Sequence, residues 1–226
     1  MSGDPLESWR SQVQRLIEQV RCHGLEIESQ AAEWMALYCH QVSLWNERSG
    51  LVSPHDLPFL VPKHLGASLG PLLIGQPRAG DRWIDVGTGG GLPGLVIKMA
   101  RPEIQMVLLD SSRKKTLFLE HMVDLLPKPL ARGVEIVDNR AENLEDTGFD
   151  VILMRAVGSL KKTLPYLDGI ARPGVRLITF KGERLDTELV TAATVMRRKG
   201  WVLEDQVDVP WSRPKLIFLR RTGSKG

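Results

Sequence analysis

The chain has 226 residues, of which 42% are apolar and 25% are charged, and its formal net charge is +3. This length and composition exclude wholesale disorder, a collagen-like repeat and a disulfide-rich miniprotein, and they predict one or two globular domains. The N-terminal residues lack the apolar run of a signal peptide, and no stretch approaches 18 uncharged apolar residues, so we expect a cytoplasmic protein without a membrane span.

The first third of the chain has the spacing of helices. Apolar residues recur at three- and four-residue intervals over residues 6–20 and again over 31–45, which predicts two amphipathic helices. A third, shorter helix is expected over 64–74, and the composition of the next six residues indicates a loop. We therefore predict a small helical region over residues 1–75 and a second domain over 76–226.

From residue 81 the pattern changes to strands that alternate with helices. The expected strands are 82–86, 105–109, 134–137, 149–154, 175–180, 201–209 and 215–220, and the expected helices are 92–100, 112–126, 159–170 and 184–199. This alternation predicts an α/β fold with a mostly parallel seven-stranded sheet and helices on both faces. The last two strands are joined by a short turn and should be antiparallel.

A glycine-rich segment, DVGTGGGLPG at residues 85–94, follows the first strand and opens a helix. Its glycines let the backbone turn sharply and approach a ligand closely. The spacing Gly89-x-Gly91-x-x-Gly94 also matches the dinucleotide fingerprint, so an NAD-type oxidoreductase stays open, whereas a Walker loop is excluded because no Gly-Lys-Ser/Thr follows.

Asp85, at the end of the first strand, favours a ligand without phosphate, whereas Asp110, at the end of the second strand, does not discriminate between S-adenosylmethionine and NAD. Asp85 would repel a pyrophosphate but tolerate the sulfonium and amino group of S-adenosylmethionine, and Asp110 would accept hydrogen bonds from both ribose hydroxyls. We therefore predict cofactor contacts from Asp85, Asp110 and the loop glycines Gly87 and Gly89.

The loop and several later motifs resemble one family. DVGTG with GLPG, LLDS at 108–111, Lys114-Lys115, the Arg140-Ala141-Glu142 motif, FDVI at 149–152, RAV at 155–157 and Lys181-Gly182 occur in order. They are similar to the bacterial small-subunit rRNA guanine-N7 methyltransferases of the RsmG (GidB) family. The resemblance covers about residues 45–182 and, more loosely, the helical N-terminus.

The resemblance implies a class I methyltransferase of Rossmann-like fold with S-adenosylmethionine as the methyl donor and 16S rRNA, free or in the 30S particle, as the acceptor that gains 7-methylguanosine. By position it implies cofactor contacts from Gly87, Leu92, Ala141, Glu142 and Arg155, and it makes Arg140 an essential family residue. The sequence departs from the family pattern at Gly50, Val52 and Ala67, which leaves the substrate contacts open.

The chemistry expected for guanine N7 needs no general base, because its in-plane lone pair attacks a methyl group directly. We therefore predict no catalytic acid or base, only positioning of the reactants supported by Arg140 and Arg155. The five histidines are scattered and the two cysteines, both expected to be buried, are too few for a cluster, so no metal site is predicted.

The charge distribution suggests an RNA-binding face. Residues 1–154 hold 15 Lys or Arg against 20 Asp or Glu, whereas residues 155–226 hold 15 against 7. We predict phosphate contacts from Arg140, Lys181 and Lys114, with a solvated surface as the alternative reading. A methyltransferase for another RNA or for a small molecule, and a non-catalytic RNA-binding module, also remain open.

Overall fold

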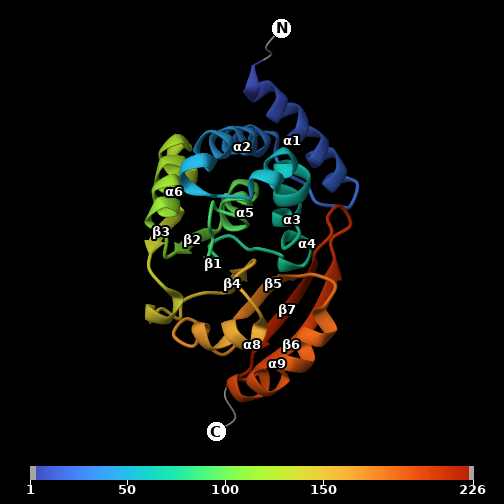
Figure 1. Cartoon of the computed structure of the whole chain (residues 1–226), viewed down its shortest axis with the longest axis vertical. Coiled ribbons are helices and arrows are strands. Elements are labelled where there is room, and N and C mark those ends of the chain that lie inside the picture. The colour runs from blue at the N-terminus through green and yellow to red at the C-terminus, as the bar shows by residue number, and fades with distance from the viewer. Residues whose placement is uncertain (1–3, 224–226) are drawn as a thin grey trace.

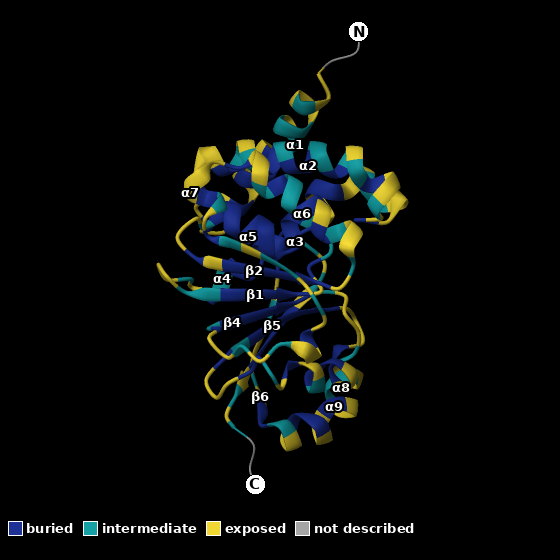
Figure 2. Cartoon of the chain, turned by 90° about the vertical axis from the view of Figure 1, so that its left-hand side faces the viewer, coloured by how far each residue is buried: buried dark blue, intermediate teal, exposed yellow. Residues whose placement is uncertain are grey.

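The chain forms three layers, with a seven-stranded sheet between two layers of helices (Figures 1 and 2). This computed structural model describes residues 4–223. The strands are β1 (Arg82–Val86), β2 (Gln105–Asp110), β3 (Val134–Asp138), β4 (Val151–Met154), β5 (Arg176–Lys181), β6 (Trp201–Asp208) and β7 (Lys215–Arg221). The predicted strands are therefore confirmed, with bounds that differ by no more than two residues.

The sheet order is β3-β2-β1-β4-β5-β7-β6. The pairs from β3 to β5 are parallel, and β7 runs antiparallel to both β5 and β6, as predicted for the last two strands. The strand order reverses between β1 and β4. In such sheets ligands bind outside the carboxyl ends of the strands at the reversal point, which places the expected site beside β1 and β4.

Helices cover the two faces unequally (Figure 2). On the upper side in Figure 2, α5 (Gly94–Ala100) and α6 (Arg113–Leu125) contact the strands. Around them pack α3 (Gly66–Leu69), α2 (Ser29–Ser49) and, outermost on α2, α1 (Pro5–Arg21). The opposite face is packed by α8 (Leu160–Thr163) and α9 (Leu185–Lys199), and the short α4 (Leu72–Gly75) and α7 (Lys128–Ala131) complete the helices. Each face has its own apolar cluster, so the buried strands separate two cores.

The helical N-terminus shares one core with the sheet. Val13 of α1 and Met35 of α2 are fully buried in the same apolar cluster as Trp83 of β1 and Phe118 of α6. The predicted division between residues 75 and 76 falls between the end of α4 and the start of β1. It stays a prediction as a domain boundary, because the apolar core is continuous across it.

Residues 54–75 differ from the single short helix predicted over 64–74. They form a 3₁₀ helix η1 (Pro54–Phe59), a π-helix η2 (Leu60–Leu65), α3 and α4 in succession. Prolines at 58, 62 and 71 account for the interruptions, because each lacks an N–H group and clashes with the preceding turn. This stretch is long and apolar enough to cross a membrane by length and composition, but 56% of its most apolar window is buried inside the protein, as expected of a core segment.

Two other expectations were wrong. The helix predicted over 159–170 is only α8 followed by the 3₁₀ helix η4 (Leu164–Leu167), since Pro165 cannot donate an α-helical hydrogen bond. Cys39 is buried as predicted, but Cys22 follows the end of α1 and is exposed.

Candidate functional site

A cavity of about 590 Å³ opens at the carboxyl ends of β1, β2 and β4, and we call it the central cavity. Its walls come from the loops that follow β1, β2, β3 and β4, and residues 51–53 of the helical region close one side. The volume lies within the range of small-molecule sites, about 300–1,000 Å³. The cavity therefore occupies the position that the strand order predicts.

The glycine loop after β1 forms the floor of the central cavity. Gly87, Gly89 and Gly91 have φ values of 71°, 60° and 91°, in the left-handed region that favours glycine. A Cβ atom on Gly87 would lie 2.9 Å from the side chain of Val157, across the cavity wall. Glycine is therefore required at position 87 both by the positive φ value and by the close approach of the loop that follows β4.

Asp85 holds this loop from behind and does not face the cavity. Its side chain is fully buried, and Oδ2 accepts hydrogen bonds from the Thr88 hydroxyl at 2.7 Å and the Gly94 N–H at 2.7 Å. Burial raises the pKa of Asp85 to about 6. Because Asp85 does not line the cavity, we correct its predicted role from a ligand contact to a residue that positions the loop.

The N–H groups of the loop are almost all used within the protein. Gly87 and Thr88 donate to the carbonyl of Leu109, and Gly91 and Leu92 donate to the carbonyl of Thr88. The N–H of Gly89 goes to Asp110, that of Gly94 goes to Asp85, and Pro93 has none. Within residues 87–94, Gly90 alone keeps an N–H without an acceptor. The loop therefore has little capacity to bind a phosphate, in contrast to a dinucleotide-binding loop.

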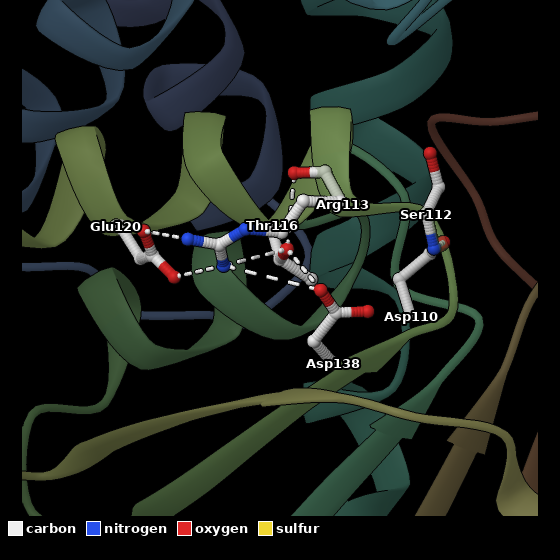
Figure 3. Close-up of polar contacts among 6 residues, drawn as sticks. All are labelled: Asp110, Ser112, Arg113, Thr116, Glu120 and Asp138. Atoms are coloured by element: carbon white, nitrogen blue, oxygen red, sulfur yellow. Dashed lines mark hydrogen bonds and ion pairs between the residues drawn. The ribbon is translucent and has the colours of Figure 1, made fainter.

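Asp110 ends β2 at the edge of the central cavity (Figure 3). Its Oδ2 accepts from the Gly89 N–H at 2.9 Å and its Oδ1 accepts from the Ser112 N–H at 2.9 Å. Each carboxylate oxygen can accept a second hydrogen bond, so the ribose contact predicted for Asp110 remains available. The ammonium group of Lys115 lies 4.0 Å from Oδ2 and lines the same cavity.

The neighbouring basic residues of α6 differ in position. Lys114, predicted to bind RNA, is exposed and lies outside the central cavity, and its neighbour Lys115 is the one that lines it. Figure 3 shows Arg113 between Glu120 and Asp138, and its guanidinium lies 2.6 Å from the Glu120 carboxylate. The RNA contact of Lys114 therefore stays a prediction, and helix phase makes Lys115 rather than Lys114 a cavity residue.

Most of the other predicted residues meet at the central cavity. The lining includes seven that were predicted to contact the cofactor: Gly87, Gly89, Leu92, Asp110, Ala141, Glu142 and Arg155. Arg140, predicted to contact phosphate, lines it as well. Ala141 is buried at the start of the 3₁₀ helix η3 (Ala141–Asn143), whereas the side chains of Arg140 and Glu142 are exposed and free to turn toward a ligand.

Arg155 follows β4 and is held by the helical region. It donates to His64 Nδ1 at 2.9 Å, to the His64 carbonyl at 3.3 Å and to the Ser68 hydroxyl at 3.4 Å. Its guanidinium also stacks over the Phe180 ring at 5.5 Å. Among residues 4–223 no carboxylate lies within 4 Å of Arg155, so burial lowers the pKa of this cation.

His64 positions the Arg155 guanidinium from the helical region. It lies in the π-helix η2, and Asp56 Oδ2 is 3.4 Å from its Nε2. Burial and the nearby Arg155 guanidinium lower the pKa of His64 to about 4. His64 is therefore neutral at physiological pH and accepts from Arg155 through Nδ1. A π-helix, common at functional sites, gave no signal in the sequence.

Lys181 does not reach the central cavity. Its side chain is 7% exposed, and the ammonium group contacts the Glu188 carboxylate at 2.8 Å and the Gly158 carbonyl at 3.2 Å. This placement argues against the predicted phosphate contact, because the charge of Lys181 is already neutralised by Glu188.

The helical region also fixes the glycine loop. The buried Tyr38 hydroxyl donates to the Gly90 carbonyl at 2.8 Å, a link between α2 and the cavity floor that no sequence motif indicated.

The three departures from the family pattern differ in position. Gly50 follows the end of α2 with a φ of 58°, and the N–H of Val52 donates to Asn46 Oδ1 at 2.9 Å. Val52 lines the cavity, whereas Ala67 is buried away from it.

Within the part of the chain that the structure describes, no group of three or more His, Cys, Asp and Glu side chains is placed to hold a metal ion. The polar groups of the central cavity are instead hydrogen-bond donors and acceptors on the loops after four neighbouring strands.

Comparison with known proteins identifies the family and the fold. A curated relative from Symbiobacterium thermophilum, named "Ribosomal RNA small subunit methyltransferase G", is 32% identical over 209 residues, which are 88% of this chain and 85% of the relative. Among solved structures, a mutant of MtNAS in complex with S-adenosylmethionine is similar over 98% of this chain and 100% of its own, with a TM-score of 0.59 and 12% identity.

A mutant of the 16S rRNA (adenine(1408)-N(1))-methyltransferase from Catenulisporales acidiphilia is similar over 77% of this chain and 94% of its own, with a TM-score of 0.52 and 15% identity. At these identities the solved structures show the fold alone, which is that of class I methyltransferases. The sequence profile described as "GidB: rRNA small subunit methyltransferase G" matches residues 31–209. The chain therefore belongs to the rRNA small subunit methyltransferase G family.

Proposed function

We propose that the protein transfers a methyl group from S-adenosylmethionine to N7 of a guanine in 16S rRNA, and that it acts in the cytoplasm on the RNA or on the 30S particle. The observation that carries the cofactor assignment is the internally hydrogen-bonded glycine loop. A dinucleotide needs free N–H groups at the helix N-terminus for its pyrophosphate, and here Asp85 occupies the one at Gly94. S-adenosylmethionine has no phosphate and makes no such demand.

The residues around the central cavity fit an adenosyl compound. Asp110 at the end of β2 retains free lone pairs that suit the two ribose hydroxyls. Glu142 lines the cavity from the loop after β3, and its exposed carboxylate is suited to accept from an adenine amino group. Gly87 and Gly89 leave the floor without side chains, and Leu92 and Ala141 supply apolar walls. The NAD-type alternative is disfavoured by the same loop.

When bound, S-adenosylmethionine supplies a methyl group activated by its sulfonium. The chain then has to hold guanine N7 in line with that methyl group, and no proton has to be removed first. Arg155 is suited to orient the base because its guanidinium is fixed by His64, Ser68 and Phe180 at the cavity wall. A rigid donor of this kind contributes through proximity and orientation, and Arg140, exposed at the rim, is suited to a phosphate.

The experiment is methyl transfer to ribosomal RNA from cells that lack this gene. Purified protein, methyl-labelled S-adenosylmethionine and either naked 16S rRNA or 30S particles are incubated, and the nucleosides are separated by mass spectrometry. We expect label in 7-methylguanosine alone. Label in another nucleoside would refute the N7 assignment, and transfer to a metabolite but to neither RNA would favour a small-molecule methyltransferase. Binding of RNA without transfer would identify a non-catalytic module.

A further inference from the structure

A second, larger hollow of about 1,010 Å³ adjoins the central cavity, and we call it the lateral groove. Its walls come from η1 and η2, from the start of the segment between β5 and α9, and from the turn between β6 and β7. Arg155 and Ala156 line both hollows, so they form the wall between them. A group that enters along the lateral groove therefore meets the central cavity at the end of β4.

The lateral groove is cationic. Five of its lining residues are Lys or Arg and two are Glu, and two of those cations are already paired, Lys63 with Asp56 and Lys181 with Glu188. Arg184, at the start of α9, and Arg213, in the turn before β7, are exposed. Over the described range, residues 4–223, neither has a carboxylate within 4 Å, so both guanidinium groups are available to an anion.

An exposed aromatic ring lies in the same groove. Phe59, the last residue of η1, is 57% exposed, which is more than any other Phe, Tyr or Trp side chain that the structure describes. Unpaired cations beside an exposed aromatic ring are the combination that single-stranded nucleic acids bind, by phosphate contacts and base stacking.

We propose that the lateral groove binds a single-stranded RNA segment that flanks the target guanine. Phe59 stacks on a base, Arg184 and Arg213 contact phosphates, and the guanine turns past the wall formed by Arg155 and Ala156 into the central cavity. This inference rests on the proposed function and specifies how its substrate is held. A guanine that enters the central cavity in this way has to be unpaired or extruded from a duplex.

The test compares groove variants with matched controls outside both hollows. Phe59→Ala, Phe59→Trp and the double variant Arg184→Gln/Arg213→Gln are assayed against Leu125→Ala and Arg198→Gln, which replace an exposed leucine and an exposed, unpaired arginine elsewhere. Affinity for S-adenosylhomocysteine, measured by calorimetry, reports whether each variant is folded with an intact central cavity. It should match the parent protein in all five.

The readout is the KM for the RNA substrate as a function of salt. We expect Phe59→Ala to raise this KM about tenfold and Phe59→Trp to restore it, because stacking on one base contributes that much. The double variant should reduce the slope of log KM against log salt concentration by about 0.7 for each arginine removed. The two control variants should change neither quantity.

The outcomes separate this inference from the proposed function. If the parent protein transfers no methyl group to rRNA, the proposed function fails. If the parent is active and the groove variants behave like the controls, the lateral groove is not the RNA path and the inference is overturned. A crosslinking experiment identifies what Phe59 contacts. With the photoreactive p-benzoylphenylalanine in place of Phe59 in a 30S complex, we expect a crosslink to RNA. A crosslink to a ribosomal protein instead would overturn the proposal in favour of protein docking.

Discussion

Replacing Gly94 with alanine is expected to push the start of α5 away from the sheet and to weaken cofactor binding. A Cβ atom at this position would lie 2.7 Å from Asp85 Cβ and 2.7 Å from Leu108 Cδ2, where ordinary contacts begin at 3.4 Å. Asp85 and Leu108 belong to the central strands β1 and β2, which are paired on both sides. The helix must therefore move, and the 2.7 Å hydrogen bond from the Gly94 N–H to Asp85 stretches.

The expected loss in the free energy of unfolding is about 2–4 kcal/mol, since overpacking alone costs about 1–3 kcal/mol and the hydrogen bond to a carboxylate adds to it. Urea unfolding, monitored by tryptophan fluorescence, measures this loss. Calorimetry measures the affinity for S-adenosylhomocysteine, which we expect to fall at least about tenfold because the loop is displaced. Gly182→Ala is the matched control, because a Cβ atom there meets no atom within 4 Å. If Gly94→Ala equals this control in both measurements, the reasoning about the loop is refuted.

Three further results are expected. Tyr38→Phe should lower the free energy of unfolding by about 1–3 kcal/mol in urea titrations, because it leaves the buried Gly90 carbonyl without its 2.8 Å donor, and an unchanged midpoint would contradict that link. Glu142→Ala should weaken S-adenosylhomocysteine binding about fivefold in calorimetry through loss of one hydrogen bond, and unaltered affinity would remove Glu142 from the adenine site. The pKa of His64 falls from 6.5 to about 4 on folding, so the unfolded chain takes up a proton at a higher pH than the folded chain does. The free energy of unfolding should therefore drop as the pH falls from 6.5 to 4, by about 1–3 kcal/mol more in the parent protein than in His64→Gln. Equal pH profiles of the two proteins would show that His64 is not buried in the neutral form.

The inner strands of the sheet were predictable because they are buried on both faces and appear as short apolar runs between turns. The central strand β4, for example, is four fully buried residues. The segment 54–75 was not predictable, because three prolines divide an apolar stretch into 3₁₀, π and α turns whose type depends on packing against α1 and α5. Periodicity alone does not encode such a mixture.

The site was predictable where backbone geometry requires a residue type and less so where side chains choose partners. Gly87 and Gly89 were found because only glycine suits their positive φ values. Asp85 was assigned to the ligand because its position at a strand end is visible in sequence, whereas its bonds to Thr88 and Gly94 depend on how the loop folds back. Lys181 was assigned to phosphate for the same reason, and its partner Glu188 is visible only once α9 is packed.

The central claim is that the loop over residues 87–94 binds an adenosyl-sulfur compound and lacks the free N–H groups that a dinucleotide pyrophosphate requires. Titration calorimetry of one protein preparation with S-adenosylhomocysteine and with NADH tests it most directly. The account predicts saturable binding of S-adenosylhomocysteine and no measurable heat of binding with NADH. Tight binding of NADH together with no binding of S-adenosylhomocysteine would contradict it.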